Sequence, residues 1–240
     1  MSSETFFDEL YSNIHQHPFL ISGLTAYMAS GQPVTPEQVR IFARLYYPHI
    51  LRTRLYQANA LGIAEDEEVQ FVLADILYDE YGNGNRARTH MEVYRKLLRS
   101  LDIPESEISS GGEVIPELRM YIDSMMRMSQ QGDWLQAAAA VGIASEWPIP
   151  EFYRKLLIGL RSVPGLTDDD LELFIGHIEL DIEHSDMMRK ALLPYTKTEQ
   201  GRNRILTGVQ MNLDMRMVFL NGVYREMLTS GSVVTMAVNG

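Results

Sequence analysis

Residues 174–188 constrain the fold more than any other segment, because they place metal-binding residue types at helical spacing. His177, Asp181 and His184 stand at positions i, i+4 and i+7. An α-helix turns by about 100° per residue, so these three side chains lie within roughly 60° of arc on one face. Glu179 and Glu183 fall on the opposite face. The segment is therefore predicted to be a helix that presents two imidazoles and a carboxylate inward, which is half of a metal site.

Composition narrows the class of protein. The chain has 240 residues, 45% of them hydrophobic, which is enough to bury the core of a single domain spanning residues 1–240. Its net charge of −11 predicts no nucleic-acid partner and no anionic membrane partner. There is no cysteine, which excludes disulfides, zinc–thiolate sites, iron–sulfur clusters and a cysteine nucleophile. The sequence shows neither a signal peptide nor a membrane-spanning run, so a cytoplasmic location is predicted.

Almost every segment has helical periodicity, and the breaks are short. Thr35-Pro-Glu-Gln38 is a capping box that begins a helix running to about residue 61, and Pro48 is expected to kink it. Residues 101–112 are expected to form a polar loop. Thr167 is expected to begin the helix that contains residues 174–188. The last helix is expected over about 198–228, with the tail beyond it frayed or docked on a neighbour. The prediction is an all-α domain of roughly seven or eight helices.

Glu146 is the most informative residue outside the first segment. Within residues 137–147 the only other polar side chain is Ser145. A buried carboxylate must be paired, protonated or bound to a cation, because leaving it alone costs several kcal/mol. Pro148 and Pro150 remove backbone donors just beyond it, so the helix should be distorted there. Glu146 is thus a candidate metal ligand, and pairing with a buried arginine is the alternative.

Glu80 and His90 are the remaining candidates. On an unbroken helix their spacing of ten residues would leave them about 80° apart. The Gly-Asn-Gly-Asn insertion at 82–85 can change that angle and bring both onto one face, and Asp79 is an alternative to Glu80. Six oxygen and nitrogen ligands without a thiolate suit iron or manganese, and two ions fit better than one. The predicted ligand set is Glu80, His90, Glu146, His177, Asp181 and His184.

The order of these residues resembles the heme-oxygenase-like di-iron oxidases, over residues from about 40 to 225. His177, Asp181 and His184 match the family's third-helix motif, and Glu146 precedes them by the expected interval. Asp79-Glu80-Tyr81-Gly82 followed by His90 looks like the first-helix motif in its longer-spaced form. The resemblance implies a heme-oxygenase-like helical bundle with two readily lost Fe(II)/Fe(III) ions on these ligands, and O2 as co-substrate.

The resemblance also implies a reaction class. Members of the family oxidise amino acids or fatty acids, giving N-oxygenation, carbon–carbon cleavage, or alkene and nitrile products. The length and acidic character of the chain look like the amino-acid-processing branch. A small amino-acid substrate is therefore expected, with conversion of a tryptophan derivative to a nitrile as the specific expectation. A fatty-acid-oxidising enzyme of the same fold and a non-enzymatic helical binding or scaffold module stay open as alternatives.

An amino-acid substrate needs a cation for its carboxylate and an apolar slot for its side chain. Arg52 and Arg54, near Tyr47, are candidates for the first; Trp147 and Tyr153 are candidates for the second. Surface salt bridges and core packing are the alternative explanations. The methionine-rich segment 114–131 and the last helix make a homodimer the expected assembly.

Overall fold

The structure is a computed structural model that describes residues 2–237, and side chains up to residue 229. Within that range the regular structure is entirely helical, which confirms the all-α prediction. The helices are α1 (Ser3–His15), α2 (Pro18–Ile21), α3 (Gly23–Ala29), α4 (Pro36–Ile63), α5 (Glu67–Glu80), η1 (Gly82–Gly84), η2 (Arg86–Arg88), α6 (His90–Ser100), α7 (Glu105–Ser110), α8 (Pro116–Gln131), α9 (Trp134–Gly142), α10 (Ile149–Leu160), α11 (Glu172–Leu192), η3 (Leu193–Lys197) and α12 (Glu199–Ala237).

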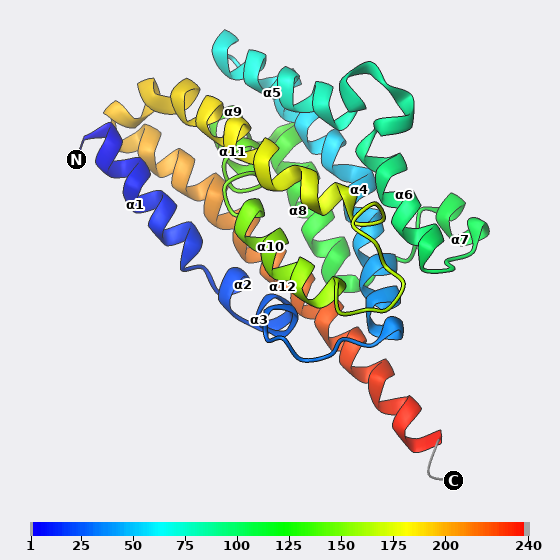
Figure 1. The fold of residues 1–240 in the computed structure, drawn as a ribbon. Coiled ribbons are helices and arrows are strands. Elements are labelled where there is room, and N and C mark those ends of the chain that lie inside the picture. The colour runs from blue at the N-terminus through cyan, green and yellow to red at the C-terminus, as the bar shows by residue number, and fades with distance from the viewer. Residues whose placement is uncertain (1, 238–240) are drawn as a thin grey trace.

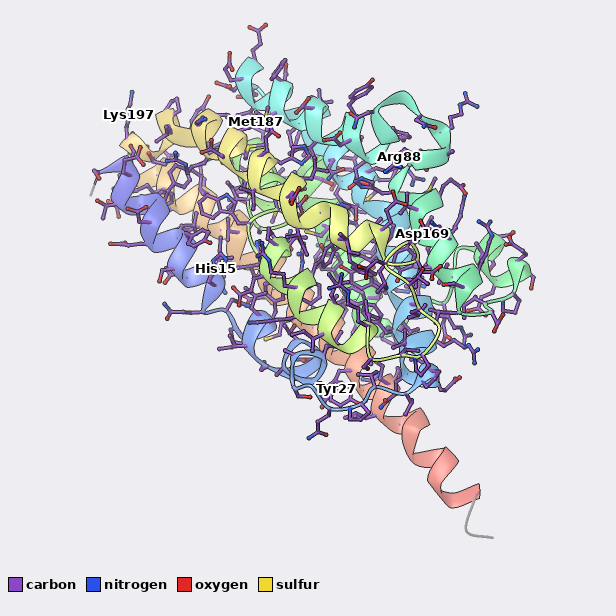
Figure 2. The ribbon with its side chains drawn as sticks, viewed as in Figure 1. His15, Tyr27, Arg88, Asp169, Met187 and Lys197 are labelled. Carbon is purple, nitrogen blue, oxygen red and sulfur yellow. The ribbon has the colours of Figure 1, made fainter. Side chains whose placement is uncertain are left out.

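The long helices form a bundle around one contiguous hydrophobic core (Figure 1). Helix α12 packs against α4, α8 and α9, and its C-terminal end extends beyond the other helices. Helix α11 lies against α10 on one side and α5 on the other. Figure 2 shows how densely side chains fill the space between the helices. The inward face of α11 is therefore enclosed, and that is the face on which the sequence places His177, Asp181 and His184.

Aromatic rings of several helices fix the interior next to this face. Tyr46 of α4 stacks on Phe219 of α12, with 5.8 Å between ring centroids. Phe174 of α11 contacts Tyr46 at 6.5 Å and Tyr153 of α10 at 4.9 Å. Large buried rings bring much apolar area into the core and prefer such tilted or offset contacts. The packing holds α4, α10, α11 and α12 at set distances around the site.

Several local predictions can be compared with the elements observed. Thr35 forms the predicted capping box with Gln38, and α4 then runs without interruption through Pro48. The segment 101–112, predicted as a loop, contains α7. Helix α11, which contains residues 174–188, begins at Glu172 and not at Thr167, because Asp170 accepts hydrogen bonds from Thr167 in a turn that precedes the helix. The last helix was expected to end near residue 228, with a tail frayed or docked on a neighbour, but it continues to Ala237; the side chains beyond residue 229 lie outside those described.

The chain between α5 and α6 reverses in a way that glycine makes possible. Gly82 and Gly84 have φ of 67° and 82°, and Asn83 between them has φ of 54°. A Cβ on Gly82 would lie 2.6 Å from the backbone carbonyl carbon of Arg88, so a larger residue does not fit there. This turn places His90, the first residue of α6, next to Glu80, the last residue of α5. The insertion at 82–85 therefore does bring these two side chains together, as predicted.

No helix within residues 2–237 combines the length and the apolar character that crossing a membrane would require.

Candidate metal centre

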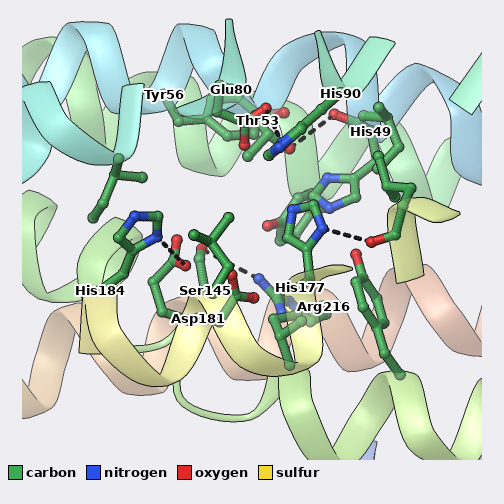
Figure 3. Close-up of a pocket in the computed structure, with 18 residues that line it drawn as sticks. His49, Thr53, Tyr56, Glu80, His90, Ser145, His177, Asp181, His184 and Arg216 are labelled. Atoms are coloured by element: carbon green, nitrogen blue, oxygen red, sulfur yellow. Dashed lines mark hydrogen bonds and ion pairs between the residues drawn. The ribbon is translucent and has the colours of Figure 1, made fainter. Parts of the chain in front are cut away.

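All six predicted ligands line one interior cavity (Figure 3). Its volume is about 50 Å³, which is room for about four water-sized groups. Glu80 comes from the end of α5 and His90 from the start of α6, while Glu146 lies in the irregular turns between α9 and α10. The distortion predicted around Glu146 is thus present, because the helical hydrogen-bond pattern breaks there. Ala144 N–H donates five residues back, to the Ala139 carbonyl, and Glu146 N–H donates only three back, to the Ile143 carbonyl; α10 begins only at Ile149.

Glu80, His90 and His177 form one half of the site. The Nδ1 atom of His90 lies 3.0 Å from Oε2 of Glu80, but it makes no hydrogen bond there. The rings of His90 and His177 are 4.4 Å apart. Nδ1 of His177 lies 2.7 Å from the carbonyl oxygen of Leu173, an acceptor, so Nδ1 carries the proton and Nε2 keeps a free lone pair. Both rings therefore have nitrogen atoms to offer to a cation.

Glu146, Asp181 and His184 form the other half. One potential ligand atom from each lies within 4.8 Å of the other two, and the residues are 6%, 2% and 3% exposed. Nδ1 of His184 is 3.7 Å from Oε2 of Glu146, while Nε2 is 2.8 Å from Oδ2 of Asp79. A histidine held at one nitrogen by a carboxylate, with the other nitrogen facing further acids, is the usual arrangement at protein metal sites. Asp79 therefore positions His184, while Glu80 faces His90.

The electrostatics show how strongly these groups act on one another. Burial and then the neighbouring Glu146 raise the pKa of Asp181 well above its usual value. Burial and then the charge of His90 lower the pKa of His177 to about 3, which keeps that ring neutral. For His184, burial acts downward, but the negative charges of Glu146 and Asp79 outweigh it and raise the pKa. For His90, burial also acts downward, but the charge of Glu80 outweighs it and raises the pKa.

The acids have no lysine or arginine partner among the described residues, which is why a cation suits the cavity. Among the described residues, no lysine or arginine nitrogen lies within 4.0 Å of the carboxylates of Glu80, Glu146 or Asp181. The buried arginine considered as an alternative partner for Glu146 exists, because Arg216 of α12 lines the cavity, but it donates to Ser145 Oγ at 3.2 Å. Buried carboxylates without counter-charge are costly. Six oxygen and nitrogen donors around them fit iron ions.

Of the five predicted substrate-binding residues, one lines the cavity and four do not. Tyr153 lines the cavity. Trp147 packs outside it, with its ring 5.9 Å from that of Phe7, so its role is in the core. The other three also lie elsewhere: the Tyr47 hydroxyl accepts from Arg95, Arg52 donates to the Pro48 carbonyl, and Arg54 sits over the Tyr81 ring.

Sequence reasoning missed Arg216. Its neighbours one turn away on α12, Leu213 and Leu220, are buried, so the arginine stands in an apolar stripe at helical spacing. A charged residue in such a stripe is a recognisable signal of a buried polar site. His49 and Tyr121, which also line the cavity, carry no such signal, because histidine and tyrosine are common in ordinary cores.

Comparison with known proteins agrees with this geometry. A family model described as iron-containing redox enzyme matches residues 40–217. A domain of Shewanella denitrificans with a heme-oxygenase-like fold superimposes with a TM-score of 0.69 at 16% identity, covering 95% of this chain and 93% of that one. At such low identity the likeness shows the fold alone, and it confirms the predicted fold class.

Two characterised relatives bear on chemistry. A 4-aminobenzoate synthase of Chlamydia trachomatis is 27% identical over 153 residues, which is 63% of this chain and 64% of the chlamydial protein. The match thus spans just under two thirds of that relative. A 4-chloro-allylglycine synthase of Streptantibioticus cattleyicolor is 24% identical over 217 residues, covering 90% of this chain and 79% of that protein.

Proposed function

The chain belongs to the family of iron-containing redox enzymes, and from that premise we propose that it is a non-heme di-iron oxidase that uses O2 to oxidise a small amino acid. The observation that carries the proposal is the convergence of Glu80, His90, Glu146, His177, Asp181 and His184 on one cavity where, among the described residues, the acids have no lysine or arginine partner. Three carboxylates and three imidazoles can hold two ferrous ions and offset much of their charge.

The protein side chains have distinct tasks in this proposal. The Leu173 carbonyl holds the proton of His177 on Nδ1, so that Nε2 is ready to bind metal. Asp79 orients His184 in the same way from Nε2. Burial and the neighbouring Glu146 favour a proton on Asp181, and that proton is released when a cation enters. Bound iron would supply the electrons that reduce O2.

The proposed substrate class rests on two further points. The names of both relatives denote amino acids as products, 4-aminobenzoate and 4-chloro-allylglycine. Tyr153 presents an aromatic ring to the cavity, 5.7 Å from the ring of His177, where an apolar side chain could pack. Oxidative carbon–carbon cleavage or N-oxidation is the proposed reaction, with nitrile formation from a tryptophan derivative as its most specific form. The homodimer stays a prediction.

Iron loading tests the proposal directly. Protein loaded with Fe(II) without oxygen is expected to retain a pair of irons per chain, measured by metal analysis after desalting. On exposure to O2, a panel of amino acids, tryptophan derivatives and fatty acids is then screened by mass spectrometry. An oxidised amino acid formed only with iron supports the proposal. Trace iron after loading, or products from fatty acids alone, would contradict it.

The matched variants lie on one helix. His184→Ala removes a proposed ligand, while Glu179→Gln changes an exposed residue on the outer face of α11. We expect His184→Ala to lose iron and turnover with unchanged helicity by circular dichroism, and Glu179→Gln to behave as the parent protein. Full activity of His184→Ala would show that the ligand assignment is wrong.

A further inference from the structure

Arg216 is a buried cation at the edge of the cavity with hydrogen-bonding capacity to spare. The residue is 4% exposed, and its guanidinium lines the cavity between Ser145 and His177 (Figure 3). Nη2 donates to Ser145 Oγ at 3.2 Å, but Nε and Nη1 have no acceptor. Arginine stays charged in proteins. Two of its three nitrogens are therefore buried, charged and unsatisfied.

The guanidinium is held in place by Ser145, itself a cavity-lining residue, and by a ring outside the cavity. Asn212, one turn earlier on α12, donates to Ser145 Oγ at 3.0 Å and to the Ala140 carbonyl at 2.6 Å. Ser145, which donates to the Ala140 carbonyl, thus links Arg216 and Asn212 of α12 to the end of α9. The Phe19 ring lies 5.8 Å from the guanidinium carbon. Such support fixes the direction of the free N–H groups.

Other unsatisfied polar groups share the cavity with Arg216. The hydroxyls of Tyr56 and Tyr121 and Nδ1 of His49 are all buried without a hydrogen-bond partner. The His49 and Tyr121 rings are 5.2 Å apart, and those of Tyr56 and Tyr121 are 6.2 Å apart. Buried polar groups are almost always satisfied in native proteins. A cluster of orphaned donors around a cation indicates a place where an anionic ligand binds.

No carboxylate of the protein fills that role. Within the side chains that the structure describes, none lies within 4.0 Å of the Arg216 guanidinium. An unpaired buried charge costs several kcal/mol, so the site is incomplete without a partner of opposite charge. Arginine forms strong, charge-assisted hydrogen bonds to carboxylates. The residues predicted for this task, Arg52 and Arg54, have other contacts and do not line the cavity.

We propose that Arg216 is the anchor for the carboxylate of the substrate and orients it toward His177 and Asp181. The inference rests on the proposed function, because it assigns the substrate of that site to the small carboxylic acids. Arg216 is a binding residue and not a metal ligand. Its loss should weaken the binding of the carboxylate without removing iron.

The test measures binding separately from iron. Anaerobic Fe(II)-loaded protein is titrated with acetate, and with acetamide as the neutral control, while thermal unfolding is followed at constant ionic strength. Acetate is expected to raise the midpoint and acetamide to leave it unchanged. In Arg216→Gln the affinity for acetate should fall at least about tenfold, as expected for the loss of one charge-assisted hydrogen bond, while the iron content stays that of the parent.

Arg225→Gln is the matched control, since Arg225 lies exposed on the same helix in an ion pair with Glu117. It should bind acetate as the parent does. L-norleucine is then compared with hexanoate. The compound that raises the unfolding midpoint more, in a way that depends on Arg216, shows whether the carboxylate belongs to an amino acid or to a fatty acid.

Three results would overturn the anchor: equal effects of acetate and acetamide, unchanged acetate binding in Arg216→Gln, or loss of acetate binding in Arg52→Gln. Failure of the proposed function looks different. The parent protein would then not retain iron, whereas the acetate titration of metal-free protein would still report on Arg216.

Discussion

Replacing Asp181 with asparagine should stabilise the metal-free protein while destroying its metal site. Asp181 is 2% exposed, has no lysine or arginine within 4.0 Å among the described residues, and offers an oxygen within 4.8 Å of one from Glu146. Two carboxylate oxygens no more than 4.8 Å apart repel each other by at least about 3.5 kcal/mol at an effective dielectric constant near 20. The asparagine side chain would keep the shape, remove one charge and donate a hydrogen bond to Glu146.

The metal-free parent avoids part of this repulsion by taking up a proton, so the expected gain is about 2 kcal/mol at neutral pH. For a protein of this size that corresponds to a rise of about 4–8 °C in the unfolding midpoint. The sign depends on pH. A carboxyl whose folded-state pKa is raised stabilises the fold fully below its unfolded pKa and loses that contribution as pH rises through the folded pKa. The advantage of Asp181→Asn should therefore shrink as pH falls toward about 4.

Urea unfolding of metal-free parent, Asp181→Asn and Glu179→Gln at several pH values measures this. Glu179 is exposed on the outer face of α11, so its variant should differ from the parent by less than about 0.5 kcal/mol. In iron-loaded samples the order should reverse, because the parent alone gains the free energy of metal binding. An Asp181→Asn protein less stable than the parent without metal would refute the reasoning that this carboxylate is uncompensated.

Three further predictions follow from particular contacts. Asp79→Asn removes the carboxylate that holds Nε2 of His184, and iron affinity should fall about 10–100-fold in competition with a chelator; an affinity within about twofold of the parent would contradict the positioning role. Gly208→Ala would place a Cβ 2.1 Å from the Gln136 carbonyl oxygen, so α12 must move away from α9, and the free energy of unfolding measured in urea should fall by about 1–3 kcal/mol. The control Gly62→Ala, whose Cβ meets nothing within 4 Å, should not lower it. Burial and then Arg216 lower the pKa of His49 to about 3. The free energy of unfolding that this residue contributes above pH 6.5 should therefore be lost as pH falls toward 3, by up to about 1.4 kcal/mol per pH unit. In His49→Phe this pH dependence should flatten, and an unchanged dependence would exclude His49 as its source.

Local patterns predicted the helices well where a chemical signal marks the boundary. Thr35 accepts a hydrogen bond from the first turn of α4, so side-chain chemistry alone identifies that start. The start of α11 was misplaced because Thr167 and Asp170 form a turn that has the same residue types as a helix cap. Helix α7 was missed because it is polar and only six residues long, so that packing on α6 decides whether the helix forms.

The candidate ligands were accessible to sequence reasoning for a similar reason. His177, Asp181 and His184 share a face through helix periodicity alone, and Glu146 is conspicuous as a lone acid in an apolar run. The substrate residues were not accessible in this way. The apolar stripe that contains Arg216 indicates a buried polar group but not its neighbours, and only the structure shows Arg216 beside Ser145 at the cavity, which Arg52 and Arg54 do not line.

The amino-acid sequence by itself determined the all-helical class, the inward stripe of α11 and the residue types that can bind metal, because each follows from spacing of a few residues along one helix. Only the tertiary structure decided that α5, α6, α11 and the turn before α10 bring those residues to one cavity, that Asp79 holds His184, and that Arg216 faces the same space. These are contacts between residues distant in the chain, some across more than a hundred residues. Such contacts arise from helix packing, to which no local pattern has access.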